Sequence, residues 1–360
     1  MSKTGKKILI SASVFDGPGL WTNGLNQNCL FLYKLFLIGG YDPIFVVNNI
    51  PDSENTKQYK FITIQMFVSK PFPVYALIEM ALKFNYVQRK IFKNKGAKLF
   101  KLFLGNILNI DIEMPTLTTQ DFVHHLPEHH GTMLNSPHHY FTQEYTSTLY
   151  NVYPNSKIGP YVWDSVFIQD LFDIYKWPSQ GPYSFTIMEP NISFIKCSLV
   201  PIMICEAFYR EKPGVLDGVI VINGTKLTQS QYFLTNILVN LDLYTYKKMF
   251  LIQRMTVRDV STKFKQNIII HHAVNNDYNY LFLEYLFMGF PVIHNYEMLK
   301  DYGYYYKGND IEAGKNMIEH VINNHGSNLE AYKCACRQLY WKFSIYNPDN
   351  IKGWQNIFDK

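Results

Sequence analysis

Several features that mark other classes of protein are missing from this chain of 360 residues. Its five cysteines are odd in number and have no C-x-x-C spacing, so they supply neither a disulfide framework nor a zinc or redox pair. No apolar run reaches the roughly eighteen residues that a membrane-spanning helix needs. Repeats, low-complexity tracts and blocks of like charge are also missing, which argues against solenoid folds and against nucleic-acid binding.

What remains is the composition of a globular protein. Hydrophobic residues make up 47% of the chain and charged residues 18%, and the length allows two domains, each with its own core. The polar start, MSKTGKK, leads directly into a predicted strand and has no signal-peptide pattern, which predicts a cytoplasmic protein. The basic residues between Lys83 and Lys101, Arg89 among them, alternate with apolar residues. We interpret them as a solvated helix face, with a peripheral phosphate or membrane contact as the alternative.

Predicted strands and helices alternate along most of the chain. The first unit of this pattern is a strand, a loop with glycine and proline, a helix and a second strand: Lys7–Val14, Phe15–Gly24, Leu25–Ile38 and Pro43–Asn48. Less regular pairs follow, and residues 121–160 are predicted to be a long loop with short elements. After a linker predicted at 177–182, strands are expected at 184–188, 218–222, 248–252, 267–271 and 291–294. Helices are expected at 193–210, 229–241, 257–265, 278–288, 312–323 and 329–343.

This order predicts an α/β fold of two Rossmann-like, doubly wound domains. The first occupies residues 1–176 and the second residues 183–345, while the segment 346–360 crosses back to the first domain. Ligands of such sheets bind beyond the carboxyl ends of the strands, so we expect the two sites to face one another across a cleft.

The first predicted loop has the chemistry of an anion site. Glycines after a strand let backbone N–H groups approach an anion, and the following helix N-terminus favours negative charge. The loop lacks G-x-G-x-x-G spacing, and the second strand ends in Asn48-Asn49 without an acid, which argues against a dinucleotide enzyme. A tight turn with a helix cap is the alternative to a ligand role. The predicted ligand residues are Gly17, Gly19, Asn23, Gly24, Asn26 and Gln27.

Two further stretches follow predicted strands of the second domain. Glu189 and Asn191 come directly after the first, with Lys196 downstream and able to meet a phosphate; helix capping is the alternative. After the fourth strand, a polar loop with Asn276 and Asp277 leads into an apolar helix that contains Glu284. An unpartnered carboxylate in such a helix is costly, so Glu284 needs a partner, and the hydroxyls of a ribose are suitable ones. A place on an exposed stripe of the helix is the alternative, which the apolar neighbours on every side make less favourable.

Histidines occur in three adjacent pairs between residues 124 and 139. Adjacent imidazoles diverge and no helical H-x-x-x-H is present, so we predict no metal site. His125 and His130 are predicted instead to contact an acceptor, with an ordinary polar loop as the alternative.

These stretches resemble a known superfamily. The segment Leu283–Ile293, LEYLFMGFPVI, resembles the LEAMACGxPVI signature of GT-B glycosyltransferases. The whole chain is similar to a little-characterised bacterial and viral family catalogued as a domain of unknown function. The similar stretches are spread over most of the chain: residues 21–28, 189–193, 279–295 and 299–305.

The resemblance implies a GT-B fold, a nucleotide sugar held mainly by the second domain, and no bound metal or other cofactor. Glu284 matches the second acid of the Glu-x7-Glu pair of many retaining members and would hold the ribose. Asn276 stands where the first acid is usual, which leaves retention or inversion open.

The implied reaction moves a sugar from a nucleoside diphosphate sugar to a glycan or other hydroxyl acceptor. Lys196 or Arg254, with the amides of the first loop, would stabilise the departing diphosphate, and Asp16 would be the base of an inverting reaction. A sugar-nucleotide epimerase of the same fold and an inactive glycan-binding module are the alternatives.

Overall fold

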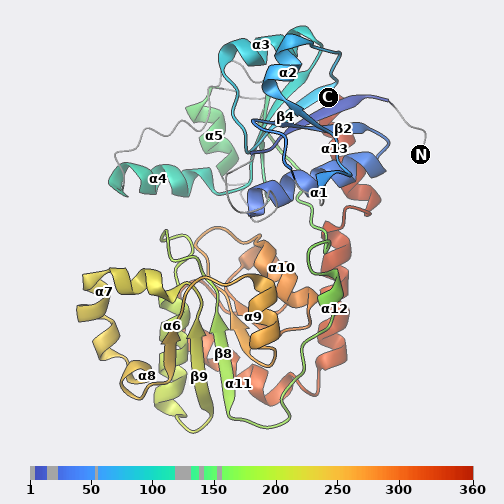
Figure 1. Ribbon diagram of the computed structural model, residues 1–360. Coiled ribbons are helices and arrows are strands. Elements are labelled where there is room, and N and C mark those ends of the chain that lie inside the picture. The colour runs from blue at the N-terminus through green and yellow to red at the C-terminus, as the bar shows by residue number, and fades with distance from the viewer. Residues whose placement is uncertain are drawn as a thin grey trace. The chain divides into compact units, whose positions relative to one another are not determined.

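The computed structural model describes residues 5–13, 23–52, 56–117, 131–137, 142–151 and 156–359. The chain divides into two compact units, Met1–Asp164 with Trp341–Lys360, and Ser165–Tyr340. Each unit contains one parallel sheet with helices packed against it (Figure 1). The division falls upstream of the linker predicted at 177–182, which lies inside the second unit, and the final segment joins the first unit from Trp341 onward.

The sheet of the first unit has seven strands in the order β3-β2-β1-β4-β5-β6-β7. Every neighbouring pair is parallel. The strand order reverses between β1 and β4, which makes this the topological switch point of the sheet. The strands are β1 Lys7–Ser11, β2 Asp42–Val47, β3 Phe61–Thr63, β4 Ala76–Glu79, β5 Lys98–Phe103, β6 Thr132–Asn135 and β7 Ser156–Ile158.

Helices of the first unit form for local reasons that the sequence contains. Asn23 caps the first helix by accepting a hydrogen bond from the amide of Asn26 at 2.8 Å, and that helix ends before Gly40, whose φ of 84° favours glycine. Asn85 and Gln88 form a capping box at the start of α3. The helices are α1 Gly24–Ile38, α2 Ile64–Ser69, α3 Tyr86–Asn94, α4 Ile107–Leu117, α5 Gln143–Leu149 and α13 Pro348–Asp359.

The last helix, α13, is part of the core of the first unit. Trp354 lies edge-on to Phe36 of α1 with ring centroids 5.5 Å apart, and Phe358 lies 5.8 Å from Tyr41. The indole nitrogen of Trp354 donates to the carbonyl of Pro160 at 3.2 Å. Residues from both ends of the chain therefore close one hydrophobic core.

Arg89 of α3 is buried, which corrects the prediction that it lies on a solvated helix face. Its guanidinium donates two hydrogen bonds to Glu79 at the end of β4, at 2.9 and 2.7 Å. Lys101 of β5 is also buried and lies 3.8 Å from the same carboxylate. A charged residue in an alternating pattern turns inward here because the strand behind the helix offers a carboxylate partner.

The sheet of the second unit has six strands in the order β10-β9-β8-β11-β12-β13, again with parallel neighbours. This is the strand order of the classical Rossmann fold, and its switch point lies between β8 and β11. The strands are β8 Tyr183–Ile187, β9 Leu216–Val221, β10 Met249–Leu251, β11 Ile268–Ile270, β12 Val292–His294 and β13 Tyr304–Tyr305.

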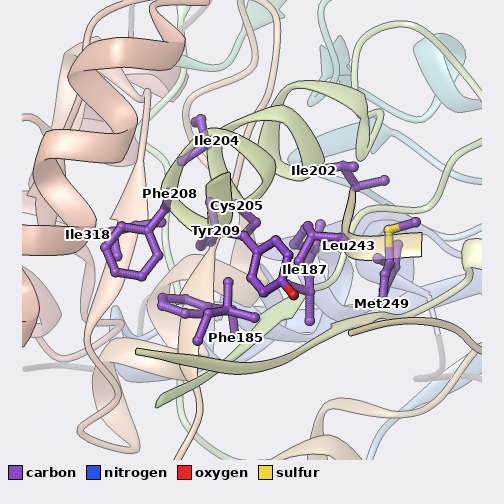
Figure 2. Close-up of a cluster of buried hydrophobic side chains, with 14 of the residues drawn as sticks. Phe185, Ile187, Ile202, Ile204, Cys205, Phe208, Tyr209, Leu243, Met249 and Ile318 are labelled. Carbon is purple, nitrogen blue, oxygen red and sulfur yellow. The ribbon is translucent and has the colours of Figure 1, made fainter. Parts of the chain in front are cut away.

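One face of this sheet packs against α6 and α11 (Figure 2). Phe185 and Ile187 of β8 meet Phe208 of α6 and Ile318 of α11 in a cluster of fully buried side chains. This packing places the carboxyl end of β8 firmly, because interior side chains at close-packed density leave little room to shift. The helices are α6 Leu199–Glu211, α7 Gln231–Asn236, α8 Asp242–Thr245, α9 Val257–Lys263, α10 Tyr280–Phe287, α11 Ile311–Asn324 and α12 Leu329–Phe343.

Two helices of the second unit differ from their predicted extents. The helix expected from Ser193 begins at Leu199, because the side chain of Asn191 accepts from the amide of Ser198 at 2.8 Å and holds an irregular turn. The helix expected over 229–241 consists of α7 and a 3-10 turn over Leu238–Asn240, and the short helix α8 follows it. Asn236 and Asn240 each donate from the side chain to a backbone carbonyl four residues earlier.

Across the described ranges, no helix combines the length and apolar composition that crossing a membrane requires.

Candidate functional site

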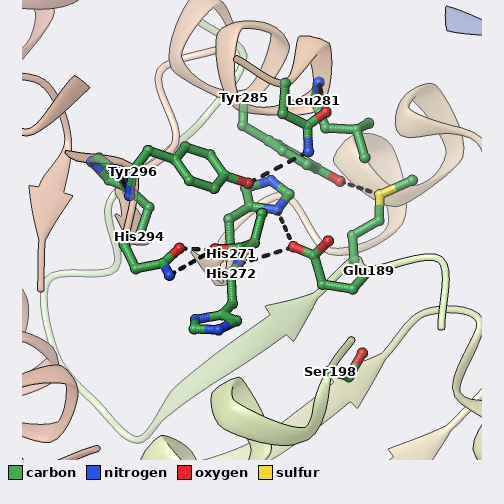
Figure 3. Close-up of polar contacts among 12 residues, drawn as sticks. Glu189, Ser198, His271, His272, Leu281, Tyr285, His294 and Tyr296 are labelled. Carbon is green, nitrogen blue, oxygen red and sulfur yellow. Dashed lines mark hydrogen bonds and ion pairs between the residues drawn. The ribbon is translucent and has the colours of Figure 1, made fainter. Parts of the chain in front are cut away.

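Polar residues follow the two strands that flank the switch point of the second sheet. Glu189 comes two residues after the end of β8, and His271 and His272 directly follow β11. The Oε1 atom of Glu189 lies 2.9 Å from Nδ1 of His271 and accepts the backbone N–H of His272 at 3.1 Å (Figure 3). All three side chains are buried. The fold thus joins two segments more than eighty residues apart at the place where open α/β sheets bind ligands.

The Glu189–His271 pair is incompletely satisfied. A carboxylate can only accept, so Nδ1 of His271 carries the hydrogen that it donates to Glu189. Within the described part of the chain, the other carboxylate oxygen, Oε2 of Glu189, and the other ring nitrogen, Nε2 of His271, have no hydrogen-bond partner although both are buried. Buried polar atoms are normally paired, so two such atoms on one pair of side chains require an explanation.

The loop after β8 is held by a pair of asparagines with left-handed backbone. Asn191 has a φ of 53° and donates from its side chain to the carbonyls of Glu189 at 3.1 Å and Asn223 at 3.4 Å. Asn223, with a φ of 59°, donates from its side chain to the carbonyl of Pro190. Asn191, predicted as a ligand, therefore lies next to Glu189, but its amide is occupied with the loop itself.

The two predicted phosphate-binding cations lie in different places. Lys196 is on the turn between β8 and α6, where burial lowers the pKa of its ammonium and the nearby Glu189 opposes that change. Arg254 is exposed and follows β10, the edge strand, which is separated from β8 by β9. Of the two, Lys196 is the cation that shares the surroundings of Glu189.

The loop between β11 and α10 uses its polar residues to fix the start of the helix. The side chain of Asp277 accepts from the amide of Met298 at 2.8 Å, and burial raises the pKa of its carboxyl. Asn279 caps α10 by accepting from the amide of Leu281 at 3.2 Å. Asn276 is buried within the same loop. Asp277, predicted as a ligand, thus ties the loop to the segment after β12.

Glu284 lies in α10 and is only 6% exposed, which rules out a place on a solvated stripe of the helix. Burial raises the pKa of its carboxyl to about 7. Its side chain forms no hydrogen bond or ion pair with any residue that the structure describes. An ionised carboxylate here would be costly, so the site favours either a proton on Glu284 or a ligand that donates to it.

Four residues outside the predicted ligand set, His272, His294, Asn295 and Tyr306, complete the surroundings. Nδ1 of His272 lies 2.8 Å from the hydroxyl of Tyr306, and Asn295 pairs with the amide and carbonyl of Ala273 at 3.0 and 2.9 Å. His294 accepts from the amide of Tyr296 and contacts the carbonyl of Tyr302, while burial lowers its pKa to about 3. The sequence contained a signal for them, since each stands at or just beyond the carboxyl end of a strand.

In the first unit, several residues of the predicted ligand loop form the start of α1 or connect it to β1. Asn26 is buried and ties α1 to the end of β1, accepting from the amide of Ser13 at 3.3 Å and donating to its carbonyl at 2.8 Å. Asn23 is the cap of α1, Gly24 its first residue and Gln27 a half-buried residue of its first turns. The remaining predicted residues of the first unit, Asp16, Gly17, Gly19, His125 and His130, lie outside the described residues.

Within the described ranges, no three His, Cys, Asp or Glu side chains are arranged to hold a metal ion.

The chain belongs to the family described as "Protein of unknown function (DUF2827)", whose sequence pattern matches residues 8–358. No curated protein matches the sequence. Solved structures resemble it over almost its full length. An alpha-glucosyltransferase in complex with UDP and a 13-mer DNA containing a HMU base is 10% identical, with 99% of this chain and 100% of that chain covered and a TM-score of 0.62.

Two other solved structures are similar to the same extent. TarM is 10% identical, covers 99% of each chain and has a TM-score of 0.64. The E. coli trehalose-6-phosphate protein bound with UDP-2-fluoro glucose is 7% identical, covers 99% of each chain and has a TM-score of 0.65. At these identities the likeness is one of fold. It confirms the predicted α/β fold of GT-B type, with two Rossmann-like domains.

Proposed function

Starting from this family membership and fold, we propose that the protein is a glycosyltransferase. It moves a sugar from a nucleoside diphosphate sugar to a hydroxyl group of a glycan or another acceptor. The observation that carries the proposal is Glu284, a buried carboxyl without a partner among the described residues, on the helix that follows the polar loop of β11. Vicinal hydroxyls of a ribose are neutral donors that satisfy such a carboxylate without adding a charge.

In this proposal Glu284 binds the nucleoside in its ionised form. Burial favours the protonated form up to a pH of about 7 when no ligand is bound. Hydrogen bonds donated by ribose hydroxyls stabilise the carboxylate, so ligand binding releases a proton at pH values near 7. Donor affinity therefore falls as the pH drops below 7.

In this proposal Lys196 and the Glu189–His271 pair lie near the diphosphate part of the donor. Lys196 would contact the diphosphate, and the positive charge would stabilise the leaving group as the glycosidic bond to the sugar breaks. Glu189 holds the His271 ring through Nδ1 and the β11 loop through the amide of His272. The pair would thus keep the loop in the conformation that receives the ligand.

The residues of the first unit keep their predicted roles within the proposal. Amides near Gly17 and Gly19 would approach the diphosphate, Asp16 would be the base of an inverting reaction, and His125 and His130 would contact the acceptor. Arg254 is the weaker candidate for the diphosphate, because it follows an edge strand.

The similar structures support the choice of donor. One of them is in complex with UDP and another is bound with UDP-2-fluoro glucose, and both cover 99% of this chain. A uridine diphosphate sugar is therefore the first donor class to test.

The proposal is tested with a panel of UDP-, GDP-, dTDP- and CMP-sugars, read by thermal shift and by release of the nucleotide. At least one donor should raise the melting temperature. Glu284→Gln should weaken its binding about 10- to 100-fold, the loss expected for hydrogen bonds to a charged group. Glu330→Gln, on the exposed start of α12, is the matched control and should bind like the wild type.

Other outcomes would overturn the proposal. A folded protein that no nucleotide sugar stabilises is not a glycosyltransferase of this kind. Conversion of the donor alone into a new sugar nucleotide would indicate an epimerase. Binding of glycans without binding of any donor would indicate an inactive module.

A further inference from the structure

The helices α2 and α3 lie next to one another on the first unit (Figure 1). Side chains of both helices line a shallow groove. The groove has a volume of about 290 Å³, and its apolar lining comes from Ile64 and Val68 of α2 and from Val87 and Ile91 of α3. We define the α2–α3 face as the exposed surface of these two helices and of Lys70 and Lys95, which directly follow them.

Large apolar side chains are unusually exposed on this face. Val87 is 62% exposed, Met66 55%, Tyr86 50% and Val68 38%. Single exposed apolar residues are common on protein surfaces, but here four of them come from two short neighbouring helices. Such a grouping is typical of a surface that contacts another apolar phase.

The same face carries positive charge without compensation. From residue 56 to residue 106 the sequence contains ten lysines and arginines but a single acid, Glu79. That acid is buried and bound to Arg89 and Lys101. Four lysines on the face, Lys70, Lys90, Lys93 and Lys95, are exposed, and none of them forms an ion pair within the described part of the chain.

The internal ion pair determines which side of α3 faces outward. Arg89 is held inside by Glu79, and Phe92, three residues later, is fully buried. Val87 and Lys90 are directed away from this buried side, since a helix turns through about 100° per residue, and Lys93 at its flank is exposed as well. Apolar and basic side chains share one surface as a result.

We propose that the α2–α3 face binds the surface of an anionic lipid membrane. The lysines would lie against the lipid phosphates, while Met66, Tyr86 and Val87 would enter the boundary between headgroups and acyl chains. A soluble polyanion would match the lysines but would leave these apolar side chains in water, so the combination favours a lipid surface. The contact is peripheral, and it is independent of the donor specificity proposed above.

The test measures co-sedimentation with vesicles of phosphatidylcholine alone and of phosphatidylcholine mixed with phosphatidylglycerol. The wild type should bind the mixed vesicles, and binding should weaken as salt rises. Each lysine near an anionic surface contributes about fivefold, so Lys90→Glu with Lys93→Glu should reduce binding at least about 25-fold. Val87→Asp should also reduce binding, and added salt should not mask its effect.

The control changes the same charges elsewhere. Lys263→Glu with Lys265→Glu, two exposed lysines of the second unit, should bind mixed vesicles within about twofold of wild type if long-range charge is screened. Thermal melting of every variant confirms that it is folded.

Three results would overturn the proposal. The wild type could fail to bind mixed vesicles, or the control could lose as much binding as the Lys90 and Lys93 variant. Alternatively, an acidic peptide could displace the protein from vesicles while Val87→Asp binds like wild type, which would indicate a site for soluble polyanions.

Discussion

Both sheets place a glutamate beside the switch point, but the two acids have different partners. Glu79 ends β4 in the first unit and is bound by Arg89 and Lys101, two cations whose side chains are buried with it. Glu189 follows β8 in the second unit and is bound by His271 and the backbone amide of His272. Glu79 is therefore bound by positively charged side chains, whereas Glu189 is bound by an imidazole and a backbone amide, which need carry no charge.

This difference indicates that Glu79 has a structural role, whereas Glu189 belongs to a candidate ligand site. The carboxylate of Glu79 is bound by cations of the protein itself, and the interaction fixes α3 to the sheet, although Nη1 of Arg89 has no partner among the described residues. Around Glu189, two polar atoms have no partner among the described residues, and Glu284 on the neighbouring helix adds an unpartnered carboxyl. A binding site is expected to be incomplete until its ligand arrives, and these unpartnered groups of the second unit are two carboxyls and an imidazole, which can bind a ligand directly.

Replacing each of the two glutamates with glutamine should produce the largest difference in stability. Glu79→Gln leaves Arg89 and Lys101 buried without a counter-charge and should lower the free energy of unfolding by about 3–5 kcal/mol. Glu189→Gln keeps an oxygen that accepts from His271 and His272 and should cost roughly 1–2 kcal/mol for its buried amide. Urea denaturation of the two variants measures both values. Equal decreases in the free energy of unfolding would mean that the two acids contribute equally to stability, which would contradict this prediction.

Glu284→Gln should raise stability while it weakens donor binding. The native carboxyl titrates near pH 7 instead of 4.5, so the folded protein holds a proton that the unfolded chain releases. The contribution of Glu284 to the free energy of unfolding of the wild type therefore falls as pH rises from 4.5 to 7. At about 1.4 kcal/mol per pKa unit, the loss is roughly 3 kcal/mol. Glutamine does not titrate, so the variant should gain this amount at pH 8 and almost nothing at pH 4.

Denaturant unfolding of wild type and variant across this pH range measures the difference. A difference that stays constant between pH 4 and pH 8 would contradict a carboxyl whose pKa is raised by burial. Glu330→Gln, exposed on α12, serves again as the control and should leave the pH dependence unchanged.

A smaller effect is expected at the start of the helix that carries Glu284. Asn279→Ala removes the cap of α10 and should cost about 1 kcal/mol of stability. Asn279→Asp keeps an oxygen that can accept from the amide of Leu281, and it should retain most of the stability. Thermal denaturation compares the two. If both variants lose the same amount, the contribution of Asn279 comes from its other contact, a 3.4 Å hydrogen bond to Tyr296.

The sequence predicted the alternation of strands and helices, the end of α1 at its glycines and the burial of Glu284, because periodicity and turn chemistry are local. It also placed Glu189 after a strand of the second sheet. It did not predict that Glu189 meets His271, since that contact depends on β8 and β11 being neighbours although β9 and β10 lie between them in the chain.

The burial of Arg89 in α3 was likewise not predictable from the local sequence. Lys90, which follows it, and Lys93 one turn later face solvent, and nothing in the local pattern distinguishes Arg89 from them. What turns it inward is Glu79 on a strand ten residues earlier. Asn191 similarly delays the start of α6 through a side-chain contact that helix propensity does not include.

The place of α13 has a consequence for how the protein is made. Trp354 and Phe358 complete the core around Phe36 and Tyr41, yet the ribosome adds them after the whole second unit. The N-terminal unit therefore emerges first but closes its core last, and the second unit, whose residues are contiguous, has everything it needs to fold in the meantime. During synthesis on the ribosome, the second unit can therefore complete its fold before the first unit does.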